Sequence, residues 1–269
     1  MSTEAYYHSI SRLAVRALLE EARLPLKPGL VAPRDNGSHR DMDYPLLVRS
    51  AFSLRHAFCR LAKAGAAGAS FDKLRQIGLA GEAQMLARTG GINTHRGALF
   101  SIGLLAAAAG SGDAAPLGEI VRCRWGAAIE SRRSLESPGK GALAAARAGL
   151  PDARAQAACG FPLVYHVGLP AYCHALKNGA NPQTALLHTF YSLLAETPDT
   201  NLLHRGGLPA LLWAQAQAKE FLQAGSIFTS DWKLRAADIH RAFVQRNLSP
   251  GGTADLLSAT LFVYSFRHP

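Results

Sequence analysis

Apolar residues recur through most of the chain at intervals of three and four positions, the spacing of a helix that buries one face. The first run contains Ile10, Leu13, Ala14, Ala17 and Leu18, and it must end before Pro25 because a residue that precedes proline avoids helical geometry. The same spacing predicts helices over 47–61, 71–89, 94–109, 114–135, 152–177, 182–195, 207–224, 231–246 and 253–266. No segment alternates apolar and polar residues with β-branched enrichment, so we expect few or no strands.

Helix-start signals support several of these boundaries. Asn181 followed by Pro182 has the form of an N-cap with proline at the first helical position. Ser230-Asp231 and Thr253 are candidate caps for the last two helices. The chain contains no internal repeat, no low-complexity tract and no linker, so the sequence predicts a single all-α domain over residues 1–269.

Composition adds that the protein is folded and basic. Of 269 residues, 48% are apolar and 18% are charged, so the chain can bury a large core and is not disordered. Lys and Arg number 29 against 19 Asp and Glu, a net charge of +10. This excess favours an anionic ligand, and a basic surface that only keeps the protein in solution is the alternative.

We expect a soluble, cytoplasmic protein that does not associate with membranes. The N-terminus lacks the basic and apolar regions of a secretory signal, and the most apolar stretch, 98–109, is too short to cross a bilayer. The four cysteines form no CxxC pair and no zinc spacing, so we interpret them as reduced thiols.

Four polar, glycine-bearing segments interrupt the helical pattern: 27–42, 82–97, 199–207 and 249–255. Each carries an acid and places glycine beside polar or basic side chains. Glycine permits close backbone approach, and free N–H groups at a helix start bind phosphate. One such segment is explained as a helix terminator, but four in one helical chain favour a shared pocket for an anion.

The charged residues of these segments suit a nucleotide and a hard cation. Mg²⁺ prefers oxygen ligands and substrate phosphates, and its candidate ligands are Asp41, Glu82, Asp199 and Asp255. The candidates for neutralising phosphates are Lys27, Arg96 and Arg205, and those for hydrogen bonds or proton transfer are His39, His95 and His204. The alternative for each is a local role, either a loop histidine or an acid that favours a helix start, and Asp255 is the clearest case of the latter.

Several function classes have no support in the sequence. The chain lacks the GxxxxGK[ST] P-loop, a GxGxxG after a strand, the GxSxG elbow and HExxH. A nucleic-acid-binding module would explain the net charge, but the acids lie inside the basic segments and the basic residues are not interleaved with aromatics. We therefore expect an enzyme that uses none of these four motifs and that has no nucleic-acid partner.

The motifs of the four segments resemble those of the triphosphoribosyl-dephospho-CoA synthase family. They are KPGLV followed by NGSHRDM, GLAGEAQM followed by TGGINTHRGALFSIGLL, then DTNLLHRGG, and finally NLSPGGTADLL. The resemblance runs in order from about Glu21 to Phe262 and so covers nearly the whole chain. It implies a transferase that joins the triphosphoribosyl part of ATP to 3′-dephospho-CoA and releases adenine.

The resemblance also implies partners and a site. A separate transferase would attach the product to the acyl carrier subunit of citrate lyase or malonate decarboxylase. A homodimer is compatible with the resemblance. The implied catalytic residues are Asp41, Glu82, Asp199, His39 and His95, and the implied Mg²⁺ ligands are Asp41, Glu82, Asp199 and Asp255. The implied substrate-binding residues are Lys27, Gly29, Asn93, Thr94, Arg96, Asn201, Arg205, Gly206, Gly251 and Gly252.

Two positions depart from the family pattern. Ala32-Pro33 follows KPGLV where the citrate lyase branch resembles KPGLVD, so an acid is absent there. Gln156 in ARAQAACGFP stands where a carboxylate is expected, which removes a catalytic acid from that position. The APRDNGSH wording is more similar to the malonate decarboxylase branch.

The implied reaction fits the residues. ATP is a β-N-glycoside and the family product is α-linked, so one direct attack by the 2′-hydroxyl is the simplest course. It needs a base beside that hydroxyl and a proton donor beside adenine; the base is one of the four acids or, as a weaker alternative, His39 or His95. The main competing hypothesis is a helical Mg²⁺-dependent glycohydrolase acting on nucleotides or ADP-ribose, which would use water as the acceptor.

Overall fold

A computed structural model of the chain describes residues 3–135 and 139–268. The described residues are almost entirely helical, and their only β-type pairing is an isolated bridge between Ala32 and Asp35. The all-α prediction is therefore confirmed. The α-helices are α1 (Thr3–Arg23), α2 (Tyr44–Ser53), α3 (Arg55–Ala66), α4 (Phe71–Thr89), α5 (Arg96–Gly110), α6 (Leu117–Leu135), α7 (Lys140–Arg147), α8 (Ala153–Ala158), α9 (Leu169–Lys177), α10 (Pro182–Glu196), α11 (Thr200–Gln223), α12 (Trp232–Gln245) and α13 (Gly251–Arg267), with short η1 (Val164–Gly168) and η2 (Ser226–Phe228).

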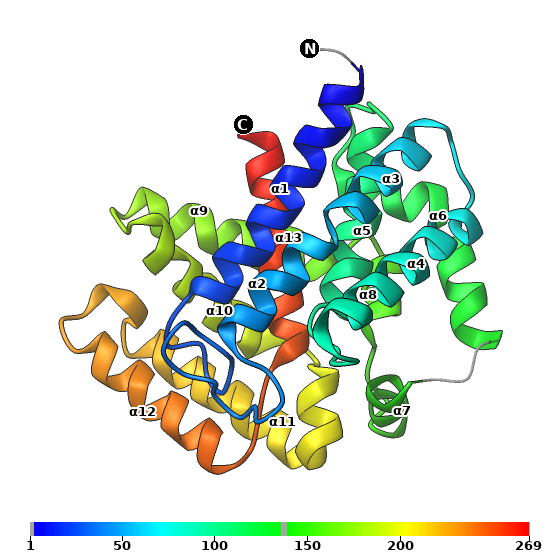
Figure 1. Cartoon of the computed structure of the whole chain (residues 1–269). Coiled ribbons are helices and arrows are strands. Elements are labelled where there is room, and N and C mark those ends of the chain that lie inside the picture. Colours follow the sequence, from blue (N-terminus) through cyan, green and yellow to red (C-terminus); the bar gives the residue numbers. More distant parts are fainter. Residues whose placement is uncertain (1–2, 136–138, 269) are drawn as a thin grey trace.

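The helices share one buried core, and α5 and α13 lie at its centre. Figure 1 shows α13 running through the middle of the molecule behind α1, with both termini at the same end. Helices α3 and α5 approach closely because two glycines face backbone across the contact. A Cβ on Gly65 would lie 1.8 Å from the Ala107 carbonyl oxygen, and one on Gly110 would lie 1.9 Å from that of Ala62. No side chain larger than hydrogen fits at either position.

Three predicted helices have different boundaries in the structure. The segment 47–61 divides at Leu54, a fully buried residue that ends α2 and begins α3. The segment 152–177 divides because Gly160 and Phe161 both have positive φ, which ends α8 before η1 and α9. Helix α11 begins at Thr200 instead of 207, and it bends at Gly207, whose φ of 68° precedes Pro209.

The cap predictions had mixed outcomes. The Asn181 side chain accepts from the Thr184 N–H, as predicted. Asp231 occupies the N-cap position of α12 but makes no capping hydrogen bond. The Thr253 prediction was wrong, because this residue lies inside α13 and donates from both its N–H and its hydroxyl to Asp199.

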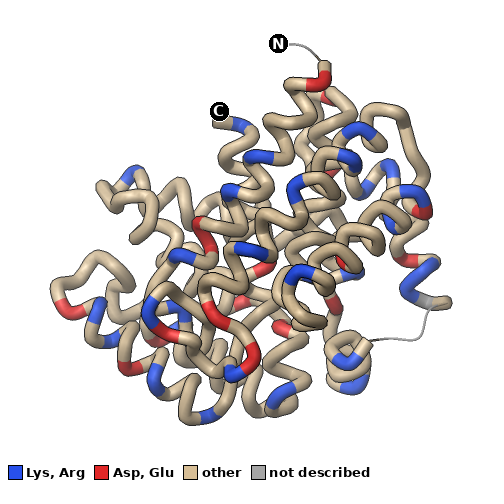
Figure 2. The backbone as a smooth tube through the Cα atoms, viewed as in Figure 1, with Lys and Arg blue, Asp and Glu red and all other residues tan. Residues whose placement is uncertain are grey.

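Charge is spread over the whole fold. Figure 2 shows Lys and Arg interspersed with Asp and Glu along the chain, without one continuous basic stripe in this view. Among the helices that the structure describes, none is long and apolar enough to span a bilayer.

Candidate active site

A cavity of about 920 Å³ lies where residues of all four polar segments meet. Fourteen of the predicted site residues line it, counting His204: Lys27, His39, Glu82, Asn93, Thr94, His95, Arg96, Asp199, Asn201, His204, Arg205, Gly251, Gly252 and Asp255. Segments that lie far apart in the sequence therefore form one site.

Asp41, Gly29 and Gly206 do not line the cavity. The Asp41 side chain is 60% exposed and faces His39 at 3.5 Å between Oδ1 and Nδ1. Gly29 has φ 65°, and a Cβ there would lie 2.0 Å from the Leu248 carbonyl oxygen, so this glycine is needed for packing. A Cβ on Gly206 would meet the Ala210 side chain at 2.5 Å. The predictions that these three residues contact substrate or metal find no support in the geometry.

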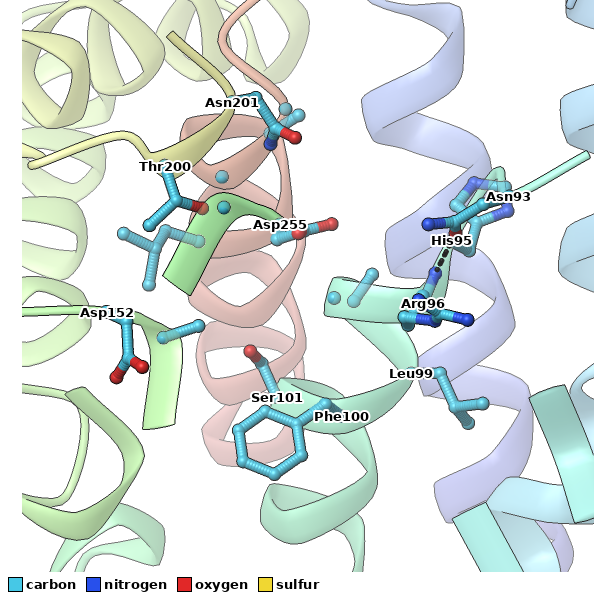
Figure 3. Close-up of a pocket in the computed structure, with 18 of the residues that line it drawn as sticks. Asn93, His95, Arg96, Leu99, Phe100, Ser101, Asp152, Thr200, Asn201 and Asp255 are labelled. Carbon is cyan, nitrogen blue, oxygen red and sulfur yellow. Dashed lines mark hydrogen bonds between the residues drawn. The ribbon is translucent and has the colours of Figure 1, made fainter. Parts of the chain in front are cut away.

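Five helices begin at the cavity: α5, α7, α8, α11 and α13. Their first turns supply Arg96 and Gly97, Lys140 and Gly141, Ala153 and Arg154, Thr200 and Asn201, and Gly251 and Gly252. Figure 3 shows Thr200 and Asn201 across the cavity from His95 and Arg96. Helix N-termini carry a partial positive charge and free N–H groups. Side-chain oxygens already accept from first-turn N–H groups of α5, α8 and α11, so the backbone favours anions through the helix dipoles and through the N–H groups that remain uncovered.

The first turn of α13 is the clearest backbone donor site. No oxygen of the described residues accepts from the N–H of Gly251 or Gly252. Both positions are crowded on the other side, since a Cβ would lie 2.7 Å from Asn201 Nδ2 at Gly251 and 3.3 Å from Asp199 Cγ at Gly252. Glycine at both positions lets the starts of α11 and α13 pack together and leaves the N–H groups uncovered.

Asp199 ties those two helix starts together. It is 1% exposed, and its Oδ1 accepts from the N–H groups of Asn201 and Leu202 at 2.9 and 3.3 Å. Its Oδ2 accepts from Thr253 N and Oγ1 at 2.7 and 2.9 Å. Burial raises the Asp199 pKa, and these four hydrogen bonds oppose the rise. A carboxylate has about four acceptor sites, so Asp199 has none left for a metal ion and serves as a structural clamp.

Asp255 differs from Glu21, Glu82 and Asp152 because it has no cationic partner in the described part of the chain, and from Asp199 because its oxygens are not fully occupied. Its carboxyl accepts from the Ala98 N–H at the start of α5, and a Cβ on Gly97 would lie 1.9 Å from its Oδ2. Burial and the nearby carboxylates of Asp199 and Glu21 raise the Asp255 pKa well above its usual range. Figure 3 shows this side chain pointing from α13 toward α5.

Lys27 forms a buried ion pair that the sequence did not predict. It is 1% exposed, and its Nζ lies 2.5 Å from Glu21 Oε1 and 2.6 Å from the Glu21 carbonyl oxygen. Burial lowers the Lys27 pKa, and the Glu21 carboxylate opposes this effect. Both residues line the cavity, so Lys27 supplies a charge that is already compensated.

Glu82 and Arg96 form a second ion pair between α4 and the start of α5. Arg96 Nε donates to Glu82 Oε1 at 2.6 Å, and Nη2 contacts the same oxygen. Asn93 Oδ1 accepts from the Arg96 N–H at 3.2 Å and so caps the helix. Arg96 keeps 58% of its side chain exposed and is accessible to a ligand.

His95 is buried, with 5% of its surface exposed. Its Nδ1 lies 2.8 Å from Ser50 Oγ, which is itself 2.5 Å from Thr94 Oγ1. Its Nε2 is buried and has no hydrogen-bond partner among the residues that the structure describes. Burial and the Lys27 charge lower the His95 pKa to about 4, so the imidazole is neutral at pH 7.

His39 and Arg205 hold the 27–42 loop in place. His39 Nε2 lies 2.8 Å from Ser249 Oγ, and its other nitrogen faces Asp41. Burial and the Arg205 charge lower the His39 pKa. Arg205 Nη1 donates to the Asn247 carbonyl at 3.0 Å and to the Ser38 carbonyl at 3.4 Å.

Apart from Gln156, sequence reasoning missed the side of the cavity formed by α6, α7 and α8. Its polar lining residues are Arg132, Arg133, Lys140, Asp152, Arg154 and Gln156. Asp152 caps α8 by accepting from the Ala155 N–H at 2.9 Å and also accepts from Arg133 Nε at 3.1 Å. The adjacent arginines 132 and 133 were the available signal, although neither lies in a glycine-bearing segment.

Gln156 lies in this region and lines the cavity. Its Oε1 is buried without a hydrogen-bond partner. An amide in this position can exchange hydrogen bonds with a ligand but cannot act as a carboxylate base, in line with the sequence expectation.

The four predicted metal ligands do not gather into one cluster. Within the described ranges, the one group of at least three His, Cys, Asp or Glu residues with close ligand atoms is Glu4, His8 and Cys59, outside the cavity. Glu4 there already receives a hydrogen bond from Lys63 Nζ at 2.5 Å. A cage of protein carboxylates around Mg²⁺ is therefore not preformed in the cavity.

Comparison with known proteins gives a consistent result. Residues 7–269 match the family model described as ATP:dephospho-CoA triphosphoribosyl transferase. A Klebsiella pneumoniae protein named 2-(5″-triphosphoribosyl)-3′-dephosphocoenzyme-A synthase is 36% identical over 94% of this chain and 93% of its own length. Proteins from Stutzerimonas stutzeri and Acinetobacter calcoaceticus, each named as a probable synthase of this kind, are 39% and 35% identical over 94% and 95% of this chain and 90% of their own lengths. No solved structure matches the chain.

Proposed function

The chain belongs to the ATP:dephospho-CoA triphosphoribosyl transferase family, and we propose that it transfers the 5-triphosphoribosyl group of ATP to the 2′-hydroxyl of 3′-dephospho-CoA. Adenine is the other product. The observation that carries the proposal is the convergence of five helix N-termini on one cavity of about 920 Å³. Such a wall favours the triphosphate and pyrophosphate groups of the two substrates, and the volume is typical of a ligand pocket.

In the proposed reaction, the 2′-oxygen attacks C1′ of the ATP ribose while the C1′–N9 bond breaks and its electron pair leaves with adenine. Inversion from the β-linkage of ATP to an α-linkage requires an odd number of displacements, and one is the simplest. No carboxylate nucleophile is then needed, which agrees with a cavity whose acids are mostly held by partners. A base beside the acceptor hydroxyl and a proton source for adenine are needed instead.

The triphosphate is proposed to lie against the starts of α5 and α13. The uncovered N–H groups of Gly251 and Gly252 would donate to phosphate oxygens, and Arg96 would add a charge. Arg205 also lines the cavity and is proposed to contact one of the two substrates. Lys27 is too deeply buried with Glu21 for the same role, and we propose that it shapes the charge around His95.

Mg²⁺ is proposed to accompany the triphosphate. Asp255 is the one predicted ligand that lines the cavity with neither a cationic partner nor fully occupied oxygens, and Mg²⁺ commonly uses one or two carboxylates with phosphates and water. Asp255 would therefore hold the ion, which when bound supplies charge neutralisation for the triphosphate. Full activity in excess EDTA, or with Asp255→Asn, would contradict this assignment.

We further propose that the product serves the malonate decarboxylase branch of the family, since APRDNGSH follows the motif KPGLV where the other branch has an acid. A separate transferase would then attach it to the acyl carrier subunit. Complementation of two synthase-deficient strains, one growing on malonate and one fermenting citrate, tests this choice. Rescue of the citrate strain alone would count against it.

The decisive experiment is mass spectrometry of the products from ATP with 3′-dephospho-CoA. We expect a triphosphoribosyl adduct and one adenine per adduct, and NMR of the adduct should report an α-linkage. Omission of the acceptor should stop adenine release. A glycohydrolase would instead release adenine from ATP alone, and ATP–adenine exchange without acceptor would indicate a covalent ribosyl intermediate.

A further inference from the structure

Among the groups of the cavity that can exchange protons, His95 is the one whose reactive atom is both buried and unpartnered. Its Nε2 has no hydrogen-bond partner in the structure, while its Nδ1 is held at 2.8 Å by Ser50 Oγ. Ser50 is completely buried on α2 and is itself held at 2.5 Å by Thr94 Oγ1. An unsatisfied buried nitrogen costs about 1–3 kcal/mol, and a substrate hydroxyl would supply the missing partner.

Of the other candidate bases, Asp41 lies outside the cavity, Asp255 is assigned above to Mg²⁺, and most of the rest are engaged. Glu82 accepts from Arg96, Glu21 accepts from Lys27, and the four acceptor sites of Asp199 are occupied. Both nitrogens of His39 face polar partners. His204 lines the cavity but is exposed, and no second side chain fixes its ring. The Ser249 hydroxyl also holds His39, but the second nitrogen of that ring faces Asp41, so a ring held by a hydroxyl with its other nitrogen unpartnered occurs at His95 alone among these residues.

We propose that His95 Nε2 is the general base that takes the proton of the acceptor 2′-hydroxyl, and that Ser50 is the residue that positions it. This inference rests on the proposed transferase function. The 2′-O–H proton passes to Nε2 as the O–C1′ bond forms and the C1′–N9 bond breaks. Adenine leaves with the electron pair and gains a proton from water, and the imidazolium then returns its proton to water.

Ser50 determines which nitrogen of the His95 ring carries the hydrogen. When Nδ1–H donates to Ser50 Oγ, Nε2 carries the lone pair and can accept a proton. Ser50 Oγ–H then donates to Thr94 Oγ1, which completes the chain of hydrogen bonds. Loss of Ser50 would allow the other tautomer, in which Nε2 carries the hydrogen and cannot act as a base.

The charges around His95 make its pKa depend on whether the substrate is bound. Lys27 is the charged group that acts on His95, and it is paired with Glu21 from α1, while α2 contributes the uncharged Ser50. Burial and Lys27 keep the pKa of the free imidazole at about 4. Bound phosphates add negative charge and raise that pKa toward the range in which a general base is effective.

The test compares His95→Gln, Ser50→Ala and the matched control His56→Gln in the full-length enzyme with ATP, Mg²⁺ and 3′-dephospho-CoA; His56 is exposed on α3 and does not line the cavity. General-base catalysis contributes roughly 10²–10⁴-fold, so His95→Gln should lower kcat by about that factor with a small change in KM. Ser50→Ala should lower kcat about tenfold or more, and His56→Gln should keep kcat within about twofold. Added imidazole should partly restore kcat to His95→Gly and not to Asp255→Asn.

The pH profile gives a readout that a structural role would not move. The acid limb of kcat/KM should report a group near pH 4 in the wild type, because the free imidazole must be neutral to accept a proton. That limb should disappear in His95→Gln. If His95→Gln proves unfolded by circular dichroism, Ser50→Ala decides instead, and unchanged kcat and pH profile in it overturn the inference.

Failure of this inference is distinguishable from failure of the proposed function. A wild type that forms no adduct refutes the function and the inference with it. A wild type that forms adduct beside a folded His95→Gln of equal kcat refutes the inference alone. Absence of imidazole rescue in a folded His95→Gly would also count against it.

Discussion

The two sides of the cavity present charge in different ways. On the side built from the motifs, Lys27, His95 and Asp199 are 1%, 5% and 1% exposed, and the two charged groups have fixed partners. On the side of α6–α8, the Arg132 and Arg133 side chains are 40% and 34% exposed, and Lys140 is exposed. Charged groups lose hydration on burial and must be paired, whereas exposed ones keep water.

This difference suggests a division of work. Groups that are held rigidly and away from water suit proton transfer and transition-state contacts, since hydrogen bonds and charges act more strongly there. Exposed cations act at longer range and are screened by salt, which suits capture of a polyanion. The comparison therefore predicts large, salt-independent effects on one side and small, salt-dependent effects on the other.

The largest expected effect is on the clamp between α11 and α13. Asp199→Ala leaves the buried Thr253 donors unpaired and removes the cap of α11, so the free energy of unfolding should fall by about 4 kcal/mol. Urea denaturation measures this change. Asp231→Ala is the control, because Asp231 is exposed at the start of α12 and makes no capping bond there. Equal losses in the two variants would refute the clamp.

The next effect concerns the buried imidazole and pH. The folded-state pKa of His95, about 4, lies below its unfolded value of 6.5, so the folded protein binds fewer protons. The stability from this group is complete above pH 6.5 and is lost as pH falls toward 4. Relative to His95→Gln, the wild type should lose up to about 3 kcal/mol over that window. The His204→Gln variant keeps His95, so its free energy of unfolding should fall with pH as that of the wild type does. A stability difference between the wild type and His95→Gln that stays constant with pH would contradict the assignment.

A smaller effect is expected at Arg96. Loss of a charge-assisted hydrogen bond costs about 1.5–3 kcal/mol, so Arg96→Ala should raise the KM of one substrate roughly ten- to hundredfold. Steady-state kinetics with each substrate varied in turn measures this. Arg122→Ala, which breaks an exposed ion pair with Glu119 outside the cavity, is the control. Unchanged KM values for both substrates in Arg96→Ala would remove Arg96 from the phosphate site.

The smallest effect is expected on the exposed side. Lys140→Ala should lower kcat/KM about two- to fivefold at low ionic strength and have no effect at about 0.5 M salt, because the Debye length shortens. Lys219→Ala, an exposed residue of α11 that does not line the cavity, should have no effect at either salt concentration. A loss in Lys140→Ala that persists at high salt would show that both sides bind substrate in the same way.

Local signals in the sequence were sufficient for much of this protein. Three-four periodicity identified α1, α4, α5, α10 and α13, because a helix that buries one face must repeat every 3.6 residues. The Asn181-Pro182 signal located the start of α10, and the predicted starts of α5 and α13 lie within two residues of the observed ones. These features depend on neighbours within one or two turns, which the sequence displays directly.

Tertiary structure alone decided which of the motif residues have side-chain atoms available to bind a ligand or accept a proton. Asp41 and Asp199 look alike as motif acids, yet Asp41 is exposed outside the cavity, whereas the oxygens of Asp199 are saturated by donors from its own helix and from Thr253, 54 residues away. Ser50 lies in no motif but fixes His95 across 45 residues, and the α6–α8 side of the cavity carries no glycine signal. The physical reason is that pairing and burial depend on distances in space, whereas periodicity and capping depend on distances along the chain.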